Sequence, residues 1–429
     1  MAEFLEIQGG KPLFGSVKAG GAKNAALPQL IASLLTGDKV SFSNVPNLED
    51  VSLTLKLLET LGAKTKREGD KIEVATPSLI ATEASYSLVK ALRASFWVLG
   101  PLLARGRAAR VALPGGDIIG ARPVDMHLSA LTQLGADINI KNGIVYATAV
   151  NGLKPANIEF RFPSVGATHQ ILMAASLIPG TTVLKGVAKE PEVVALAEML
   201  ISMGADIEGH GTEKIVVKGV EVLNGATINL IGDRIEAGTY LLAGIASRGE
   251  VQVNGIDPGF LTSFLNILKE MGVEVLTGVD WIRVKAPTTL KPVHVVTGPF
   301  PELATDLQAP LMAALCTASG TSTLDEKVFE GRFGNVSLLC RMGAKITVHD
   351  QTATIEGVEK LQGAPVDGLD IRAAASLVVA ALGAEGLTTI GETHHLRRGY
   401  EYLERKLNSL NARIGFRIAD ADDYMFTGC

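Results

Sequence analysis

The sequence repeats a helix-ending signature at near-constant intervals, and this period constrains the fold more than any other feature. Successive copies lie 73, 69, 68, 71 and 68 residues apart. Six units of about 70 residues therefore fill the chain. The signature, an apolar residue followed by glycine and a small residue, with Asn replacing the glycine in the last copy, stands at Leu61-Gly62-Ala63, Leu134-Gly135-Ala136, Met203-Gly204-Ala205, Met271-Gly272-Val273, Met342-Gly343-Ala344 and Leu410-Asn411-Ala412.

Each unit is expected to contain a strand, a loop, an amphipathic helix, two short strands and a second, more apolar helix. Because the second helices are apolar on all sides, we expect them to be buried inside α/β (α+β) domains of three units each. An open solenoid is the alternative, but units this long are unusual in solenoids and the end units are not polar caps. The second helices are predicted at Ala22 to Leu35, Leu88 to Ala104, Val165 to Ile178, Ile235 to Ser247, Asp306 to Ala318 and Ile371 to Ala384.

The net charge, the apolar runs and the cysteines argue against several classes of partner and location. A net charge of −5 gives no reason to expect nucleic acid or an anionic membrane as partner. The first residues lack the pattern of a secretory signal, and no apolar run reaches the roughly 18 residues of a membrane span. Cys316, Cys340 and Cys429 cannot complete a disulfide framework, so we expect buried or inert thiols and a cytoplasmic protein.

The predicted starts of the second helices carry basic residues that helix capping does not explain. Lysine or arginine there opposes the helix dipole unless an anion is bound. Asn, Ser, Thr and Asp at the same places are ordinary N-caps, and that interpretation stays open for each position. The candidate residues are Lys23, Asn24, Arg93, Ser164, Val165, Gly166, Asp233, Arg234, Glu236, Thr305, Asp306, Asp370 and Arg372.

The second unit carries an insertion. The distance from the glycine before its first strand to the glycine after its first helix is 29 residues, against 23 to 25 in the other units. The inserted segment, 113–125, places Asp117 and Arg122 between glycines, which favours a mobile lid. A plain surface turn is the alternative, because Pro114-Gly115-Gly116-Asp117 is also good turn chemistry.

Arginines gather at the remaining loops, where Arg332 and Arg398 join those at the helix starts. Guanidinium groups suit phosphate and carboxylate, so the pattern indicates a small substrate with two anionic groups. No Walker or dinucleotide glycine motif is present. His394-His395 is too short a cluster for a metal site, and we expect neither metal nor cofactor.

These residues resemble the UDP-N-acetylglucosamine enolpyruvyl transferase family nearly from end to end. The resemblance implies an inside-out α/β barrel fold of two domains, 1–21 plus 233–429 and 22–232, with the substrate cleft where the chain crosses between them. It is carried by Gly21-Ala22-Lys23-Asn24-Ala25-Ala26-Leu27-Pro28, Arg93-Ala94-Ser95-Phe96-Trp97, Gly120-Ala121-Arg122-Pro123-Val124-Asp125, Ser164-Val165-Gly166-Ala167-Thr168, Asp233-Arg234-Ile235-Glu236, Thr305-Asp306-Leu307-Gln308 and Arg398-Gly399-Tyr400-Glu401.

The resemblance also implies an activity, the first committed step of peptidoglycan synthesis, in which the enolpyruvyl group of phosphoenolpyruvate passes to the 3'-hydroxyl of UDP-N-acetylglucosamine. It makes Asp306 the base, Asp117 the acid and Asp370 an assistant in proton handling, and it counts Lys23 as catalytic as well. The implied phosphoenolpyruvate contacts are Lys23, Asn24, Arg122 and Arg398. The implied sugar-nucleotide contacts are Arg93, Arg122, Pro123, Val124, Asp125, Met126, Phe162, Pro163, Ser164, Val165, Asp306 and Val328. The implied supporting residues are Arg332, Arg372, Gly166, Arg234 and Glu236.

The sequence departs from the common family pattern at the lid. Most members carry cysteine at the position of Asp117, and an aspartate-bearing subset exists, so the resemblance implies resistance to fosfomycin, which alkylates that cysteine. Leu303-Ala304 stands where Phe-Pro is frequent, and Gly331 where Asn is frequent. The shikimate-pathway enolpyruvyl transferase and a catalytically dead regulatory paralogue are the alternatives. The oligomeric state is left open.

Overall fold

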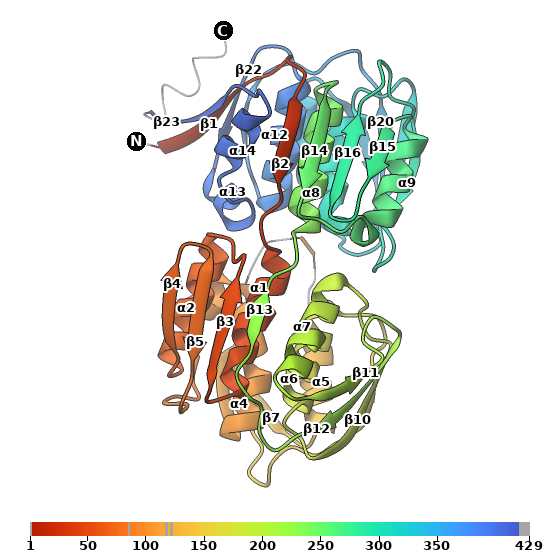
Figure 1. Cartoon of the computed structure of the whole chain (residues 1–429). Helices are drawn as coiled ribbons and strands as arrows, with labels where there is room; N and C mark the ends of the chain where they lie inside the picture. Colours follow the sequence, from red (N-terminus) through yellow and green to blue (C-terminus); the bar gives the residue numbers. More distant parts are fainter. Residues whose placement is uncertain (1, 85, 116–118, 121–122, 420–429) are drawn as a thin grey trace. The chain divides into compact units, whose positions relative to one another are not determined.

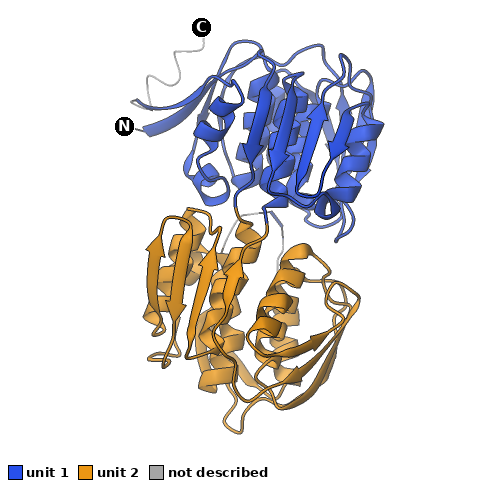
Figure 2. Ribbon diagram, in the orientation of Figure 1, with its two compact units in different colours: residues 1–20, 118–121, 232–429 blue, residues 21–117, 122–231 orange. Residues whose placement is uncertain are grey.

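The computed structural model describes residues 2–84, 86–115, 119–120 and 123–419 (Figure 1). Contacts between Cα atoms divide the chain into two compact units (Figure 2). Unit 1 comprises Met1–Gly20, Ile118–Ala121 and Gly232–Cys429, and unit 2 comprises Gly21–Asp117 and Arg122–Ile231. Apart from the short segment Ile118–Ala121, the chain therefore leaves unit 1 after Gly20 and returns after Ile231.

Each unit contains three sheets among its described residues, and five of the six sheets share one strand order. An edge strand pairs in parallel with the next strand, and two antiparallel strands follow. The sixth sheet lacks the edge strand and has a parallel bridge, Glu83 to Arg110, in its place. This shared order is consistent with the predicted sixfold repeat.

The sheets of unit 1, in strand order, are β15 (Glu274–Thr277), β16 (Trp281–Lys285), β14 (Glu250–Asn254), β2 (Phe14–Lys18); β17 (His294–Val296), β18 (Thr321–Asp325), β20 (Thr352–Glu356), β19 (Lys345–His349); and β21 (Pro365–Asp367), β22 (Leu387–Gly391), β1 (Ala2–Gln8), β23 (Ile414–Ala419). Those of unit 2 are β13 (Thr227–Asn229), β3 (Lys39–Ser43), β5 (Lys71–Ala75), β4 (Lys64–Glu68); β6 (Ala108–Ala112), β8 (Ile144–Thr148), β7 (Asp137–Lys141); and β11 (Asp206–Glu208), β12 (Lys214–Gly219), β10 (Gly180–Lys185), β9 (Asn157–Glu159).

Helices apolar on all sides lie at the centre of each unit, where they have no solvent-facing side. In unit 1, α10 is buried along its whole length, and α8 and α12 are buried except at the last residue. The central helices are α8 (Arg234–Ala246), α10 (Gln308–Leu315) and α12 (Ile371–Gly383) in unit 1, and α1 (Lys23–Ala32), α4 (Leu99–Gly106) and α6 (Val165–Ala175) in unit 2. The charged side chains on these helices therefore lie near the helix ends.

Shorter or amphipathic helices complete the two units. In unit 1 these are α9 (Thr262–Glu270), α11 (Val336–Arg341), α13 (His394–Gly399) and α14 (Leu403–Ser409). In unit 2 they are α2 (Glu49–Thr60), α3 (Tyr86–Ala91), α5 (Asp125–Gln133) and α7 (Pro191–Ser202). The 3-10 turns are η1 (Ser33–Leu35), η2 (Arg93–Val98), η3 (Pro258–Leu261) and η4 (Thr305–Leu307).

One sequence prediction is wrong, and the expected burial of the cysteines holds only in part. The helix predicted from Leu88 to Ala104 is broken, because Leu92 takes an extended conformation (φ −138°, ψ 117°) between α3 and the 3-10 turn η2. Cys316 is buried as expected, but Cys340 is exposed, since it faces away from the core on the short helix α11. In the described part of the chain, no helix is both long enough and apolar enough to cross a membrane.

Residues 20–22, where the chain leaves unit 1, run beside residues 231–233, where it returns. The N–H of Asp233 donates to the carbonyl of Gly20 at 2.8 Å in unit 1, and the N–H of Ala22 donates to that of Ile231 at 2.8 Å in unit 2. A Cβ on Gly232 would lie 1.9 Å from the carbonyl oxygen of Gly255, a distance that no side chain tolerates. Only glycine therefore fits at this passage.

We predict that Gly232→Ala destabilises unit 1 by about 1–3 kcal/mol, because the backbone must shift to admit the methyl group. Thermal denaturation followed by circular dichroism should show a transition several degrees lower. Gly334→Ala is the matched control, since its Cβ would meet only Leu369 Cδ1, at 3.8 Å. Equal stability of the two variants would contradict the steric argument.

Candidate active site

Side chains that the sequence analysis placed at helix starts cap three central helices. Asp233 accepts from two backbone N–H groups of α8, at 2.8 and 3.0 Å. Asp370 accepts from two N–H groups of α12, at 2.7 and 3.0 Å. Ser164 accepts from one N–H of α6, at 3.3 Å. Ordinary capping thus accounts for these three positions and orders the helix starts around them.

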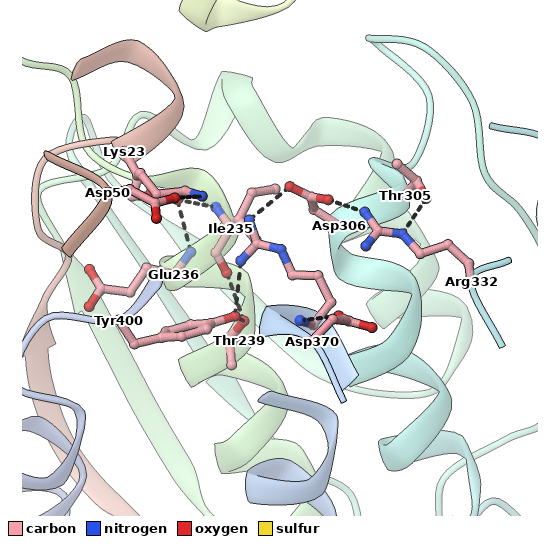
Figure 3. Close-up of polar contacts among 12 residues, drawn as sticks. Lys23, Asp50, Ile235, Glu236, Thr239, Thr305, Asp306, Arg332, Asp370 and Tyr400 are labelled. Carbon is pink, nitrogen blue, oxygen red and sulfur yellow. Dashed lines mark hydrogen bonds and ion pairs between the residues drawn. The ribbon is translucent and has the colours of Figure 1, made fainter. Parts of the chain in front are cut away.

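Asp306, in η4, lies between two buried guanidinium groups of unit 1 (Figure 3). Arg332 donates to one carboxylate oxygen, and Arg372 Nη2 donates to the other at 2.8 Å. The two arginines are only 7% and 6% exposed. Arg332 Nε also donates to Thr305 Oγ1 at 3.2 Å. Since each oxygen has its own cationic donor, the carboxylate is fixed in one orientation.

Glu326 is fully buried and holds the turn beside Asp306. One of its oxygens accepts from the hydroxyl of Thr305 at 2.9 Å. The other accepts from the N–H groups of Val328 at 2.8 Å and Phe329 at 3.0 Å. This one carboxylate therefore connects the Asp306 turn to Val328, a predicted substrate contact.

Arg372 has further partners in the interior of unit 1. Its Nη1 donates to the hydroxyl of Tyr400 at 3.3 Å. Burial lowers the pKa of Arg372, but the Asp306 carboxylate, with Tyr400 and Asp233, raises it by more, so that the pKa lies above its usual value. Arg372 is therefore a permanent cation fixed between Asp306 and Tyr400.

Glu236, on α8, is buried where the chain leaves unit 1. One of its oxygens accepts from the backbone N–H of Gly20 at 2.6 Å. The other accepts from Lys406 Nζ at 2.7 Å and from the Tyr240 hydroxyl at 2.8 Å. Burial raises the pKa of Glu236, and Lys406 lowers it by less. This cluster fixes the backbone at Gly20, where the chain leaves unit 1, against α8.

In unit 2, Lys23 begins α1 and donates to Asp50 on α2 at 3.2 Å. Lys23 is 8% exposed and Asp50 1%. A lysine opposes the dipole at a helix start, and α1 has no side-chain cap, so the Asp50 carboxylate offsets the unfavourable charge. Asn24 follows on the same turn and is half-buried.

A buried histidine packs against the start of α6. His127 Nδ1 lies 2.6 Å from Gln170 Oε1. Gln170 Nε2 donates to the carbonyl of Phe96 at 3.2 Å, so its oxygen faces the imidazole and Nδ1 carries the proton. A Cβ on Gly166 would lie 3.0 Å from Trp97 Nε1 and 3.2 Å from His127 Nε2. The glycine lets α6 approach both rings.

A cation and an aromatic ring, Arg161 and Phe162, lie just before the start of α6. Arg161 forms an ion pair with Asp125, the first residue of α5, and its guanidinium lies 5.8 Å from the centre of the Phe162 ring. Phe162 is 50% exposed. The other predicted sugar-nucleotide contacts in unit 2 that the structure describes are Arg93 at the start of η2, Pro123, Val124 and Met126 around the start of α5, and Pro163 and Val165 beside Ser164.

Two predicted lid residues, Asp117 and Arg122, lie outside the described residues. Of the segment between them, the carbonyl of Ile119 accepts from the N–H of Gly331 at 3.0 Å. Arg398 lies on α13 and is half-buried.

The structure brings Asp306, Arg332 and Arg372 together, with Asp370 at the same end of α12 as Arg372. Arg234 is buried, with its guanidinium 5.9 Å from the Phe300 ring. The sequence analysis missed the buried partners that hold these groups. They are Asp50, His127, Thr239, Glu326, Lys406 and, quoted in a motif but given no role, Tyr400. No local signal could have found them, because each lies far along the chain from its partner.

No group of three or more His, Cys, Asp or Glu side chains is arranged to hold a metal ion within the described ranges. His394 and His395 lie with ring centres 4.0 Å apart, and His394 Nδ1 lies 3.3 Å from Glu392 Oε2.

Comparison with known proteins gives one family model and close relatives. The model of the EPSP synthase (3-phosphoshikimate 1-carboxyvinyltransferase) family matches residues 7–407. The chain is 49% identical to the UDP-N-acetylglucosamine 1-carboxyvinyltransferase of Acinetobacter baylyi, which it covers to 99%, and 48% identical to that of Dinoroseobacter shibae, which it covers to 98%. Each alignment takes in 96% of this chain.

Solved structures share the fold. The enolpyruvyl transferase NikO from Streptomyces tendae superposes with a TM-score of 0.88 at 27% identity, over 98% of this chain and all of that one. An EPSP synthase from Acinetobacter baumannii gives a TM-score of 0.75 at 19% identity, over 97% of this chain and all of that one. The second likeness shows the fold alone.

We predict that unit 2 loses stability as the pH falls from about 6.5 towards 5. Burial lowers the pKa of His127 and of His169 to about 4, so the folded unit takes up fewer protons there than the unfolded chain. Each histidine should then lower the free energy of unfolding by on the order of 1.5 kcal/mol over that pH interval. Urea denaturation of the double variant His127→Gln/His169→Gln should depend less on pH than that of the parent protein. An unchanged pH dependence would contradict the assignment.

Proposed function

The chain belongs to the UDP-N-acetylglucosamine 1-carboxyvinyltransferase family, and we propose that it transfers the enolpyruvyl group of phosphoenolpyruvate to the 3'-hydroxyl of UDP-N-acetylglucosamine, releasing phosphate. Identity of 47–49% to relatives with this name, over 96% of the chain, carries the proposal. The predicted enolpyruvyl transferase fold, α/β in two domains, is confirmed by the matched structures. We place the domain boundaries at residues 21/22 and 232/233.

The reaction needs one base and one acid. The 3'-hydroxyl loses a proton and its oxygen bonds to C2 of phosphoenolpyruvate, while the methylene carbon gains a proton. The resulting ketal then loses a proton from its methyl group and expels phosphate, which restores the double bond. Asp306 is our proposed base, since Arg332 and Arg372 fix its carboxylate and leave the direction of its oxygens defined. Asp117 is our proposed acid, and Asp370 assists in proton handling.

The cationic residues would hold the donor. We propose that Lys23, Asn24, Arg122 and Arg398 bind the phosphate and carboxylate of phosphoenolpyruvate, because these are the anionic groups of the donor and three of the four residues are cations that pair with such groups. Asp50 would keep the Lys23 ammonium in place, since it already pairs with it at 3.2 Å.

The sugar nucleotide would lie on unit 2. We propose that it contacts Arg93, the segment from Arg122 to Met126, the segment from Phe162 to Val165 and, in unit 1, Asp306 and Val328. The start of α6 supports this placement, because the dipole of a helix start favours an anion and Ser164 orders this start as its cap. We propose no cofactor, metal or nucleic acid, and a cytoplasmic location.

The shikimate reaction is the second candidate, since the matched family model carries its name. The curated relatives favour the sugar nucleotide, because they are far more similar than the EPSP synthase structure at 19% identity. Phosphate release from phosphoenolpyruvate should be measured with UDP-N-acetylglucosamine and, separately, with shikimate 3-phosphate. Preference for the second acceptor would overturn the substrate, and inertness with both would favour a catalytically dead paralogue.

We predict that Asp306→Asn lowers turnover about a hundredfold or more, because the amide keeps the shape but cannot take up the proton. Isothermal titration should show that the variant still binds UDP-N-acetylglucosamine. Retained turnover would remove Asp306 from the mechanism. Glu302→Gln, an exposed carboxylate a few residues away in the same unit, is the control that should keep full activity.

We predict that fosfomycin does not inactivate this protein, because a carboxylate at Asp117 is a far poorer nucleophile towards an epoxide than a thiolate. Asp117→Cys should stay active and become open to time-dependent inactivation, with a covalent adduct visible by mass spectrometry. Rapid inactivation of the parent protein, with an adduct inside segment 113–125, would show that the role of Asp117 is misassigned.

A further inference from the structure

A buried chain of hydrogen bonds begins at Arg372 and passes through Tyr400 and Thr239 to the carbonyl of Ile235 (Figure 3). Arg372 Nη1 lies 3.3 Å from the Tyr400 hydroxyl, which lies 3.0 Å from Thr239 Oγ1. Thr239 Oγ1 in turn lies 2.8 Å from the carbonyl of Ile235 on α8. Tyr400 is 3% exposed and Thr239 2%. The chain thus connects the backbone of α8 to the cation that holds Asp306.

The direction of each hydrogen bond follows from the donors available. The carbonyl of Ile235 can only accept, so Thr239 gives it its single proton. Thr239 Oγ1 must then accept from the Tyr400 hydroxyl, and the Tyr400 oxygen is left to accept from Arg372. The hydrogen bonds from Arg372 to Tyr400, from Tyr400 to Thr239 and from Thr239 to Ile235 therefore all run in one direction.

Tyr400 acts here as a neutral phenol. Burial raises its pKa, and Arg372 and Thr239 lower it by less, so the hydroxyl keeps its proton at neutral pH. Its ring lies under the guanidinium as well, 5.9 Å from the central carbon of Arg372. The hydroxyl therefore orients the cation and exchanges no proton with it.

The backbone fixes where Tyr400 stands. Gly399 ends α13 against the start of α12, where a Cβ would lie 2.6 Å from Ile371 Cγ2. Tyr400 follows in an extended conformation (φ −135°, ψ 110°), which turns it into the interior of unit 1. The Gly399-Tyr400 pair thus joins close backbone packing to a defined hydroxyl position.

We propose that Tyr400, oriented by Thr239, is a positioning residue for the transfer reaction: it holds the Arg372 guanidinium in the plane in which Nη2 meets the Asp306 carboxylate. This inference rests on the proposed function, in which Asp306 is the base. Arg372 is only 6% exposed, so water cannot readily replace a lost acceptor at Nη1. Without the hydroxyl, the guanidinium turns, and the Asp306 oxygen that it holds loses its direction.

Tyr400→Phe removes the hydroxyl and keeps the ring, and its steady-state kinetics should be compared with those of the parent protein. We expect kcat to fall about ten- to a hundredfold with KM for both substrates within about twofold, since Tyr400 touches neither. Tyr240→Phe is the matched control. Its hydroxyl is equally buried in unit 1 and donates to Glu236, so it should cost similar stability and leave kcat within about twofold.

Thr239 gives a second test, which holds even if Tyr400→Phe folds poorly. Thr239→Val, which removes the acceptor at constant shape, should lower kcat, and Thr239→Ser, which keeps the hydroxyl, should restore it. The double variant Tyr400→Phe/Thr239→Val should be no slower than Tyr400→Phe alone, because both changes break one chain.

Parent protein that is inactive with UDP-N-acetylglucosamine would overturn the proposed function itself. Active parent protein whose Tyr400→Phe or Thr239→Val variant keeps its full kcat would overturn only the positioning role. An equal loss of kcat in Tyr240→Phe, or additive losses in the double variant, would likewise show a merely structural effect.

Discussion

The burial of three apolar helices inside each unit is the constraint on which the rest depends. A helix surrounded on all sides by protein has no polar face, so hydrophobic burial fixes its position and leaves only its ends for charged groups. In unit 1 the starts of α8 and α12 carry Asp233, Glu236, Asp370 and Arg372. The same packing that stabilises the core therefore concentrates the chemistry.

Charges so deep in a protein persist only when they are paired and hydrogen-bonded. Asp306 has two guanidinium partners, Glu236 has an ammonium, a phenol and a backbone N–H, and Lys23 has the Asp50 carboxylate. Each pairing also removes rotational freedom from a long side chain. Groups held in this way are oriented before any ligand arrives, and such preorganisation is a main source of catalysis in enzymes.

A buried, hydrogen-bonded carboxylate also holds the chain where it passes between the units. Glu236 accepts from the N–H of Gly20, while Asp233, the N-cap residue of α8, donates its own N–H to the carbonyl of that glycine. The start of α8 therefore binds both the N–H and the carbonyl of Gly20, the residue at which the chain leaves unit 1. Helix packing, chain crossing and site geometry meet within one turn of α8.

The sequence by itself determined the elements that depend on local pattern: the period near 70 residues, the apolar central helices and the cations at their starts. It went wrong where the pattern was ambiguous, as at Leu92, because a continuous apolar run does not reveal a break in helical geometry. Only the tertiary structure decided which side chains meet. Asp306 and Arg372 are 66 residues apart, and Thr239 and Tyr400 are 161 apart. Such pairs arise when packed helices bring distant starts together, and no spacing along the chain encodes them.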